Sequence, residues 1–111
     1  MVLRTEKKAD VIVFYCPERI DVLSFSDFVN AVNQLKEKNI NKIILEMSRT
    51  HSIDSAGFSV IVKCLKQCKE NDGALKIVQP QSRVIEMLNL TGLASVVRIH
   101  ENIDSALEDL K

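Results

Sequence analysis

Residues 42–70, "KIILEMSRTHSIDSAGFSVIVKCLKQCKE", decide the fold of this chain. The stretch opens with an apolar run at 42–47, which is typical of a buried strand, and continues into residues 55–70, whose apolar positions recur at helical spacing. Asn71 and Gly73 follow as helix stop signals. A buried strand that leads into an amphipathic helix through a short polar connection predicts an α/β domain.

Further strands and helices alternate on both sides of this unit. Short apolar runs predict the other strands, at residues 2–5, 11–15, 74–80 and 95–100. Helical periodicity and capping residues predict the other helices, at residues 24–39, 82–90 and 103–110. The chain therefore belongs to the α/β class. We expect one domain over residues 1–111, with a mixed, mostly parallel β-sheet, an N-terminal hairpin and about four helices.

Two details of this expectation concern the segment between the hairpin and the first helix. Pro17 cannot donate a hydrogen bond to a ladder, so we predict that residues 16–23, "CPERIDVL", form a loop. Ser24 is then expected to begin the helix, because Asp27 stands three residues later at the spacing of a capping box.

The composition excludes several functional classes. Fifteen basic and fifteen acidic residues cancel, whereas proteins that bind nucleic acids or anionic membranes usually carry a basic surplus. No run of about 18 apolar residues is present, and the first residues lack the apolar core of a signal peptide. Three cysteines without framework spacing indicate a reducing compartment. We therefore expect a cytoplasmic protein with no nucleic-acid partner and no membrane insertion.

Residues 54–57, "DSAG", between the central strand and its helix, are the candidate functional site. Open α/β sheets bind ligands beyond the carboxyl ends of their strands, and a helix N-terminus favours an anion. Asp54 is a candidate N-cap, Ser55 lies in the first helical turn, and Gly57 permits a close backbone approach. The residue pattern leaves two interpretations open. Asp54 and Ser55 either form a helix cap alone or belong to a functional site.

Other chemistry has less support in the residues. His51, Asp54 and Ser55 include the residue types of a catalytic triad, but a triad depends on geometry and not on adjacency, so we expect no enzyme. The residues point to no cofactor and no metal site, and Cys64 and Cys68 are expected in the core. We expect His100, at the end of a strand, to be solvated.

Two apolar residues of the second helix have two possible places. Phe58 and Val62 lie beside the apolar face of this helix. They either complete the core or form an exposed apolar patch next to Ser55, and the sequence leaves both possibilities open.

Four segments together resemble the STAS domain, and in particular bacterial anti-sigma factor antagonists. "IDSAG" at 53–57 resembles the phosphorylation loop of the family, and "RVIEMLNLTGL" at 83–93 is similar to its helix that ends in Leu-Thr-Gly-Leu. "ENIDSAL" at 101–107 resembles the terminal helix, and "RID" at 19–21 matches a Gly-Glu-Leu-Asp segment in part. The resemblance covers nearly the whole chain and implies the same α/β fold.

The resemblance also implies a function and a set of residues. It marks Ser55 as the phosphorylated serine, with Asp21 and Asp54 as acidic neighbours; the surrounding site or partner-binding residues are Ala56, Gly57, Phe58 and Val62. In the family, the unphosphorylated protein binds an ATP-binding anti-sigma factor that is also a serine kinase. The kinase phosphorylates the serine, and a PP2C-type phosphatase removes the phosphate. The alternative is a non-phosphorylated STAS subunit of a transport ATPase or another signalling complex.

Overall fold

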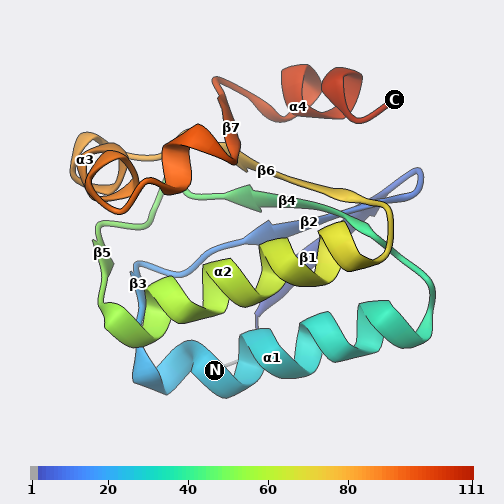
Figure 1. Cartoon of the computed structure of the whole chain (residues 1–111), viewed down its shortest axis with the longest axis horizontal. Helices are drawn as coiled ribbons and strands as arrows, with labels where there is room; N and C mark the ends of the chain where they lie inside the picture. Colours follow the sequence, from blue (N-terminus) through green and yellow to red (C-terminus); the bar gives the residue numbers. More distant parts are fainter. Residues whose placement is uncertain (1–2) are drawn as a thin grey trace.

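The computed structural model describes residues 3–111, which form a five-stranded sheet and a separate two-stranded ribbon (Figure 1). The elements, in chain order, are β1 (Arg4–Lys8), β2 (Val11–Tyr15), β3 (Arg19–Ile20), α1 (Val22–Glu37), β4 (Lys42–Glu46), β5 (Ser52–Ile53), α2 (Ser55–Glu70), β6 (Ala74–Val78), α3 (Ser82–Leu90), the short 3-10 helix η1 (Leu93–Ser95), β7 (Arg98–His100) and α4 (Ile103–Asp109). The sheet order is β1-β2-β4-β6-β7, with β1 antiparallel to β2 and every other pair parallel. The predicted mixed, mostly parallel sheet with an N-terminal hairpin is thus confirmed.

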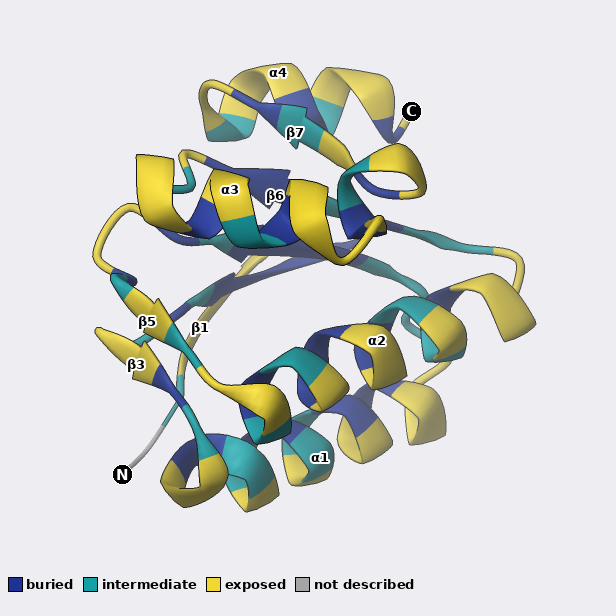
Figure 2. Ribbon diagram, turned by 60° about the vertical axis from the view of Figure 1, so that its left-hand side comes forward, coloured by how far each residue is buried: buried dark blue, intermediate teal, exposed yellow. Residues whose placement is uncertain are grey.

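Helices cover both faces of the three inner strands β2, β4 and β6, and the buried side chains of these strands are apolar on both faces. Helices α1, α2 and α3 contribute to the larger core cluster, which contains Phe14, Phe28 and Ile61. Helix α4 covers the opposite face, where Val13 and Ile44 pack with Ala106. This double coverage explains why β2 and β4 read as continuous apolar runs. Figure 2 shows the buried strands between the two helical layers.

The hairpin and the last strand differ from the sequence prediction. Strand β1 continues to Lys8, so the turn contains only Ala9 and Asp10, with Ala9 at a φ of 57°; Val2 of the predicted strand lies outside the described residues. The polar residues of the expected turn are accommodated because an edge strand exposes its side chains to water. Strand β7 begins only at Arg98, since residues 93–95 form η1.

Helix α1 begins two residues earlier than predicted. Asp21 is its N-cap, and the capping box joins Asp21 to Ser24, so the predicted pairing of Ser24 with Asp27 is wrong. The segment predicted as a loop contains β3, which pairs in parallel with β5 at residues Arg19–Ile20 and Ser52–Ile53. Strands of two residues carry no periodic signal, and only their pairing makes them visible.

His100 is buried, so the prediction of a solvated side chain is wrong. Its Nδ1 lies 2.9 Å from Ser105 Oγ and its Nε2 lies 3.1 Å from Asp109 Oδ2. Asp109 also accepts from Lys76 Nζ at 3.1 Å, which lowers the pKa of this carboxyl through the Lys76 hydrogen bond. These contacts hold α4 against the edge of the sheet. The predicted N-cap of α4 is confirmed, because the Asn102 side chain accepts from the Ser105 amide.

A candidate phosphoacceptor corner

Two helices with aspartate N-caps begin side by side at one end of the β3–β5 ribbon. Ile20 pairs with Ile53 in register, so the next residue of each strand, Asp21 or Asp54, lies at the same end of the ribbon. Each aspartate is the N-cap of the helix that follows, α1 or α2. Figure 1 shows both helix starts below the ribbon, and we call this place the corner.

Ser55 is the first residue of α2 and is exposed. The Asp54 carboxylate accepts from the Gly57 amide at 2.8 Å, and the Asp54 carbonyl accepts from the Phe58 amide at 2.8 Å. The amides of Ser55 and Ala56 lie in the first turn of α2, where an N–H group has no intrahelical acceptor, and they stay available to an anion. The predicted N-cap is therefore confirmed, and the cap leaves the hydroxyl of Ser55 accessible.

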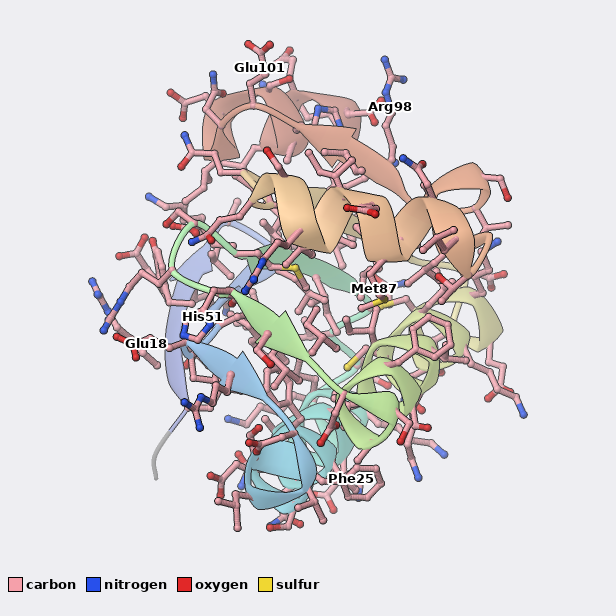
Figure 3. The ribbon with its side chains drawn as sticks, turned by 90° about the vertical axis from the view of Figure 1, so that its left-hand side faces the viewer. Glu18, Phe25, His51, Met87, Arg98 and Glu101 are labelled. Atoms are coloured by element: carbon pink, nitrogen blue, oxygen red, sulfur yellow. The ribbon has the colours of Figure 1, made fainter. Side chains whose placement is uncertain are left out.

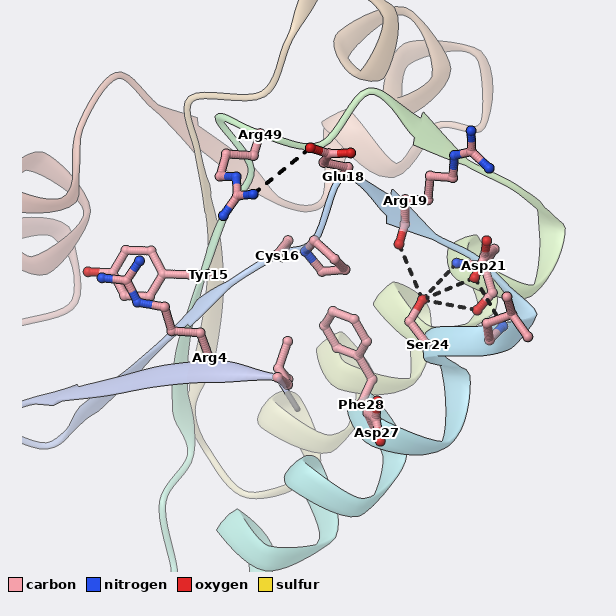
Figure 4. A pocket seen from close by; sticks show the side chains of 13 residues that line it. Arg4, Tyr15, Cys16, Glu18, Arg19, Asp21, Ser24, Asp27, Phe28 and Arg49 are labelled. Atoms are coloured by element: carbon pink, nitrogen blue, oxygen red, sulfur yellow. Dashed lines mark hydrogen bonds and ion pairs between the residues drawn. The ribbon is translucent and has the colours of Figure 1, made fainter. Parts of the chain in front are cut away.

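Asp21 is held more tightly than Asp54, because Asp21 and Ser24 form a reciprocal capping box. Its carboxylate accepts from the Leu23 amide at 3.0 Å, while the Ser24 hydroxyl accepts from the Asp21 amide at 2.9 Å. The Ser24 side chain is buried, and its hydroxyl also lies 3.3 Å from the Arg19 carbonyl oxygen (Figure 4). The start of α1 is thus fixed to β3, and the acidic group of the corner has a defined position.

Gly57 allows β3 to cross the first turn of α2. A Cβ at this position would lie 1.9 Å from the Ile20 carbonyl oxygen and 2.6 Å from the Ile20 carbonyl carbon. The Asp54 amide donates to the same Ile20 oxygen at 3.3 Å. The predicted close approach is confirmed, and it joins the two halves of the corner.

Apolar side chains surround the corner in two different ways. Phe58 is half-buried and packs against the core, whereas Val62 has 39% of its surface exposed. Phe58 therefore belongs to the core, whereas Val62 is an exposed apolar residue. On α1, Val22 is 69% and Leu23 is 81% exposed, and neither residue was among the predicted site residues.

A hollow of about 460 Å³ borders the corner on the α1 side (Figure 4). Asp21 and Leu23 contribute to its wall, and Tyr15 and Phe28 line it as well. Three arginines line it: Arg4 stacks over the Tyr15 ring at 4.5 Å and Arg49 lies 3.9 Å from a Glu18 oxygen, whereas the Arg19 side chain has no such contact within residues 3–111.

The described residues offer no nucleophile–base pair or metal cluster at the corner. The Ser55 hydroxyl has no hydrogen bond to a histidine, and no group of three or more His, Cys, Asp or Glu residues within 3–111 has the arrangement of a metal site. Cys64 and Cys68 are buried as predicted, and burial raises the pKa of each thiol to about 12. Within the same residues, no helix combines the length and apolar character needed to cross a membrane.

One sequence signal does point to the start of α1, which the prediction placed two residues too late. "RIDVLSF" at 19–25 matches "SIDSAGF" at 52–58 at the Ile-Asp step and at the final Phe. In both segments the isoleucine lies in the ribbon, the aspartate caps a helix, and the phenylalanine is half-buried. Comparing the two segments would have placed the start of α1 correctly.

The fold is that of a STAS domain, and the STAS domain model matches residues 3–106. The chain belongs to the STAS domain family. A candidate anti-sigma factor antagonist of Thermotoga neapolitana is 37% identical over 87 residues, which cover 78% of this chain and 71% of that protein.

Solved structures agree with this assignment. The crystal structure of a candidate anti-sigma factor antagonist from Thermotoga maritima has a TM-score of 0.89 at 30% identity, and the match covers 97% of this chain and 93% of that one. The Bacillus cell fate determinant SpoIIAA in its phosphorylated form has a TM-score of 0.79 at 12% identity, with 99% and 100% of the two chains covered. At this low identity the likeness to SpoIIAA concerns the fold alone.

Proposed function

We propose that this chain is an anti-sigma factor antagonist whose binding is switched by phosphorylation of Ser55. The names of its Thermotoga relatives support the class. The observation that carries the switch is the position of Ser55, which is exposed at the first residue of α2 with its helix cap supplied by Asp54. We expect no catalytic role for the chain itself, because its part is to bind.

The corner suits a switch that changes the surface and leaves the fold intact. A phosphate on Ser55 adds about −1.5 to −2 charges at neutral pH. The free amides at the start of α2 can receive it, so the packing of the helix need not change. Asp54 and Asp21 already make the corner acidic, and the phosphate concentrates one sign of potential there. A partner packed over a neutral serine would have to desolvate the phosphate, which opposes binding.

The proposed partners follow from the same chemistry. The unphosphorylated corner binds an anti-sigma factor that is also an ATP-dependent serine kinase, and this binding frees the sigma factor. Phosphorylation of Ser55 releases the antagonist, and a PP2C-type phosphatase restores the binding form. The exposed Val22, Leu23 and Val62 around the corner supply apolar area for such a contact.

Substitution of Ser55 by alanine tests the assignment. The Ser55→Ala protein should keep its fold, measured by circular dichroism, and should take up no phosphate from the anti-sigma factor kinase of the same organism. Ser59→Ala is the matched control, because Ser59 is exposed one turn further along α2 and its hydroxyl donates to the Ser55 carbonyl at 3.0 Å. Phosphate found on Ser52 or Ser59 in the Ser55→Ala protein would contradict the assignment.

The two phosphoforms test the switch itself. Phosphorylation should weaken kinase binding at least about tenfold, which corresponds to about 1.4 kcal/mol. Amide NMR shifts should stay close to the corner. Shifts that spread to α4 would show a global change and contradict the local account, and equal affinity of both forms would remove the switch. Association with transporter subunits and no kinase would favour the alternative STAS role.

A further inference from the structure

The arginines of this chain fall into two groups. Three have an aromatic or acidic partner within the described residues: Arg4 over Tyr15 at 4.5 Å, Arg49 with Glu18 at 3.9 Å, and Arg98 with Asp109 at 3.7 Å. Arg19 and Arg83 have no ion pair or side-chain hydrogen bond within residues 3–111, and both are exposed. These two arginines come from distant parts of the sequence, yet both flank β5, the strand that leads into Ser55.

The topology places the two arginines on either side of β5. Arg19 lies in β3 directly across from Ser52, because these two residues are partners in the parallel register. Arg83 lies in the first turn of α3, which packs on the other side of β5. His51 immediately precedes β5 and has no side-chain hydrogen bond within the described residues, so its ring is available as a donor. Figure 3 views the molecule from this end, with the ribbon below α3.

A hollow of about 280 Å³ lies between β5 and α3. Its lining residues are His51, Ser52, Ile53, Arg83, Val84 and Met87. The basic and polar groups of this set surround a partly apolar wall. The volume is below the roughly 300–1,000 Å³ of typical small-molecule sites, so the hollow suits one or two side chains of a protein better than a free ligand.

The hollow adjoins the corner but has the opposite charge. Ile53 contributes to its wall, and Asp54 and Ser55 follow directly in the chain. An unpaired arginine therefore lies on each side of β5, Arg19 in β3 and Arg83 in α3, and the acidic groups lie at the end of the ribbon where the helices begin. Complementary charges across an interface steer association and fix the orientation of a partner. An acidic group of the partner would match the unpaired arginines here, while the aspartates at the corner would repel it.

We infer that Arg83 and His51, which line this hollow, and Arg19, which lies across from Ser52 in β3, form a basic subsite that receives an acidic segment of the protein that binds the corner. This inference rests on the proposed function, because the occupant is the same partner that binds over unphosphorylated Ser55. A Glu or Asp side chain of that segment enters the hollow with its methylene groups on the apolar wall. Its carboxylate meets the Arg83 guanidinium, which has the geometry for bidentate binding. The subsite sets the orientation of the partner, while Ser55 sets its release.

A direct test uses hexaglutamate as a probe and hexaglutamine as its neutral control, at low salt, with amide NMR as the readout. Hexaglutamate should give saturable shifts at Ser52, Ile53 and Arg83, and hexaglutamine should give none. Arg83→Glu should weaken the binding roughly three- to tenfold, as expected for reversal of an exposed charge. Arg83→Glu is not expected to unfold the protein, because an acidic residue in the first turn of a helix is favourable.

Lys7→Glu is the matched control for Arg83→Glu. Lys7 is an exposed basic residue of β1 near the hairpin, at the opposite end of the molecule from β5 (Figure 1), and its reversal changes the net charge equally. Hexaglutamate should bind the Lys7→Glu protein as it binds the wild type. Equal weakening by both substitutions, or shifts spread over all basic residues, would overturn the subsite.

A second measurement separates this inference from the proposed function. The affinity of the anti-sigma factor kinase is measured for the wild type, for Arg83→Glu and for the Ser55 phosphoform. The subsite requires that Arg83→Glu lowers the association rate and reduces its salt dependence. If the phosphoform binds weakly while Arg83→Glu binds normally, the subsite is wrong and the switch stands. If the wild type does not bind the kinase at all, the proposed function is wrong, and the subsite is then not a contact for the kinase either.

Discussion

Replacement of Gly57 by alanine should destabilise the protein, although helix propensity alone predicts the opposite. The added Cβ would lie 1.9 Å from the Ile20 carbonyl oxygen, and both nearest atoms belong to backbone that no rotamer change can move. Either β3 or the first turn of α2 must move by about 1.5 Å to restore ordinary contact. Such overpacking costs about 1–3 kcal/mol. Loss of the 3.3 Å bond from the Asp54 amide to Ile20 costs about 1 kcal/mol more, which roughly offsets the gain of about 1 kcal/mol from alanine in a helix.

We therefore expect a net loss of about 1–3 kcal/mol and a melting temperature lower by about 4–12 °C. Urea unfolding followed by circular dichroism measures the free energy, with Ser59→Ala as a control that should stay within about 0.5 kcal/mol. Because the clash separates Asp21 from Asp54, the Gly57→Ala protein should also be a poorer kinase substrate at temperatures where it is folded. An unchanged or raised stability would refute the argument, since it would mean that β3 does not press on α2.

Two further predictions concern the core beneath the corner. Phe58→Ala should lower the free energy of unfolding in urea by about 2–3 kcal/mol, less than the roughly 3–5 kcal/mol of a fully buried phenylalanine, because Phe58 is half-buried against the core. Val62→Ala is the control, and equally small effects of both substitutions would place Phe58 outside the core. Stability should fall as the pH rises from about 9 towards 12. The pKa of Cys64 and of Cys68 is raised to about 12 from 9.0, so the unfolded chain loses these protons first; a Cys64→Ala, Cys68→Ala protein with the same alkaline loss would contradict this cause.

Much of the α/β framework could be predicted because its signals are local. Helix α2 has the predicted bounds, since its apolar face, its Asp54 cap and its stop signals all lie within one stretch of sequence. The inner strands were visible as apolar runs, because helices cover both of their faces. Strand β1 was harder to place, because an edge strand exposes polar side chains and so looks like a turn.

Burial of polar groups could not be read from the sequence. His100 lies at a strand end, where solvent was expected, but Ser105 and Asp109 on α4 occupy both of its ring nitrogens. The division between Phe58 and Val62 was equally open, since both lie beside the same helical face. Only the packing of neighbouring elements decides which of these side chains is covered.

The sequence by itself determined the α/β class, the chemistry of the segment at 54–57 and the place of Ser55 at a helix start. These follow from periodicity and from cap and glycine chemistry, which act over a few residues. The tertiary structure alone decided that Asp21 caps a helix at the same end of the ribbon as Asp54 and that Arg19 and Arg83 flank one strand. Both arrangements depend on the β3–β5 pairing and on the packing of α3 against β5. Two-residue strands have no pattern of their own, so the physical cause of the corner lies in contacts between segments far apart in the chain.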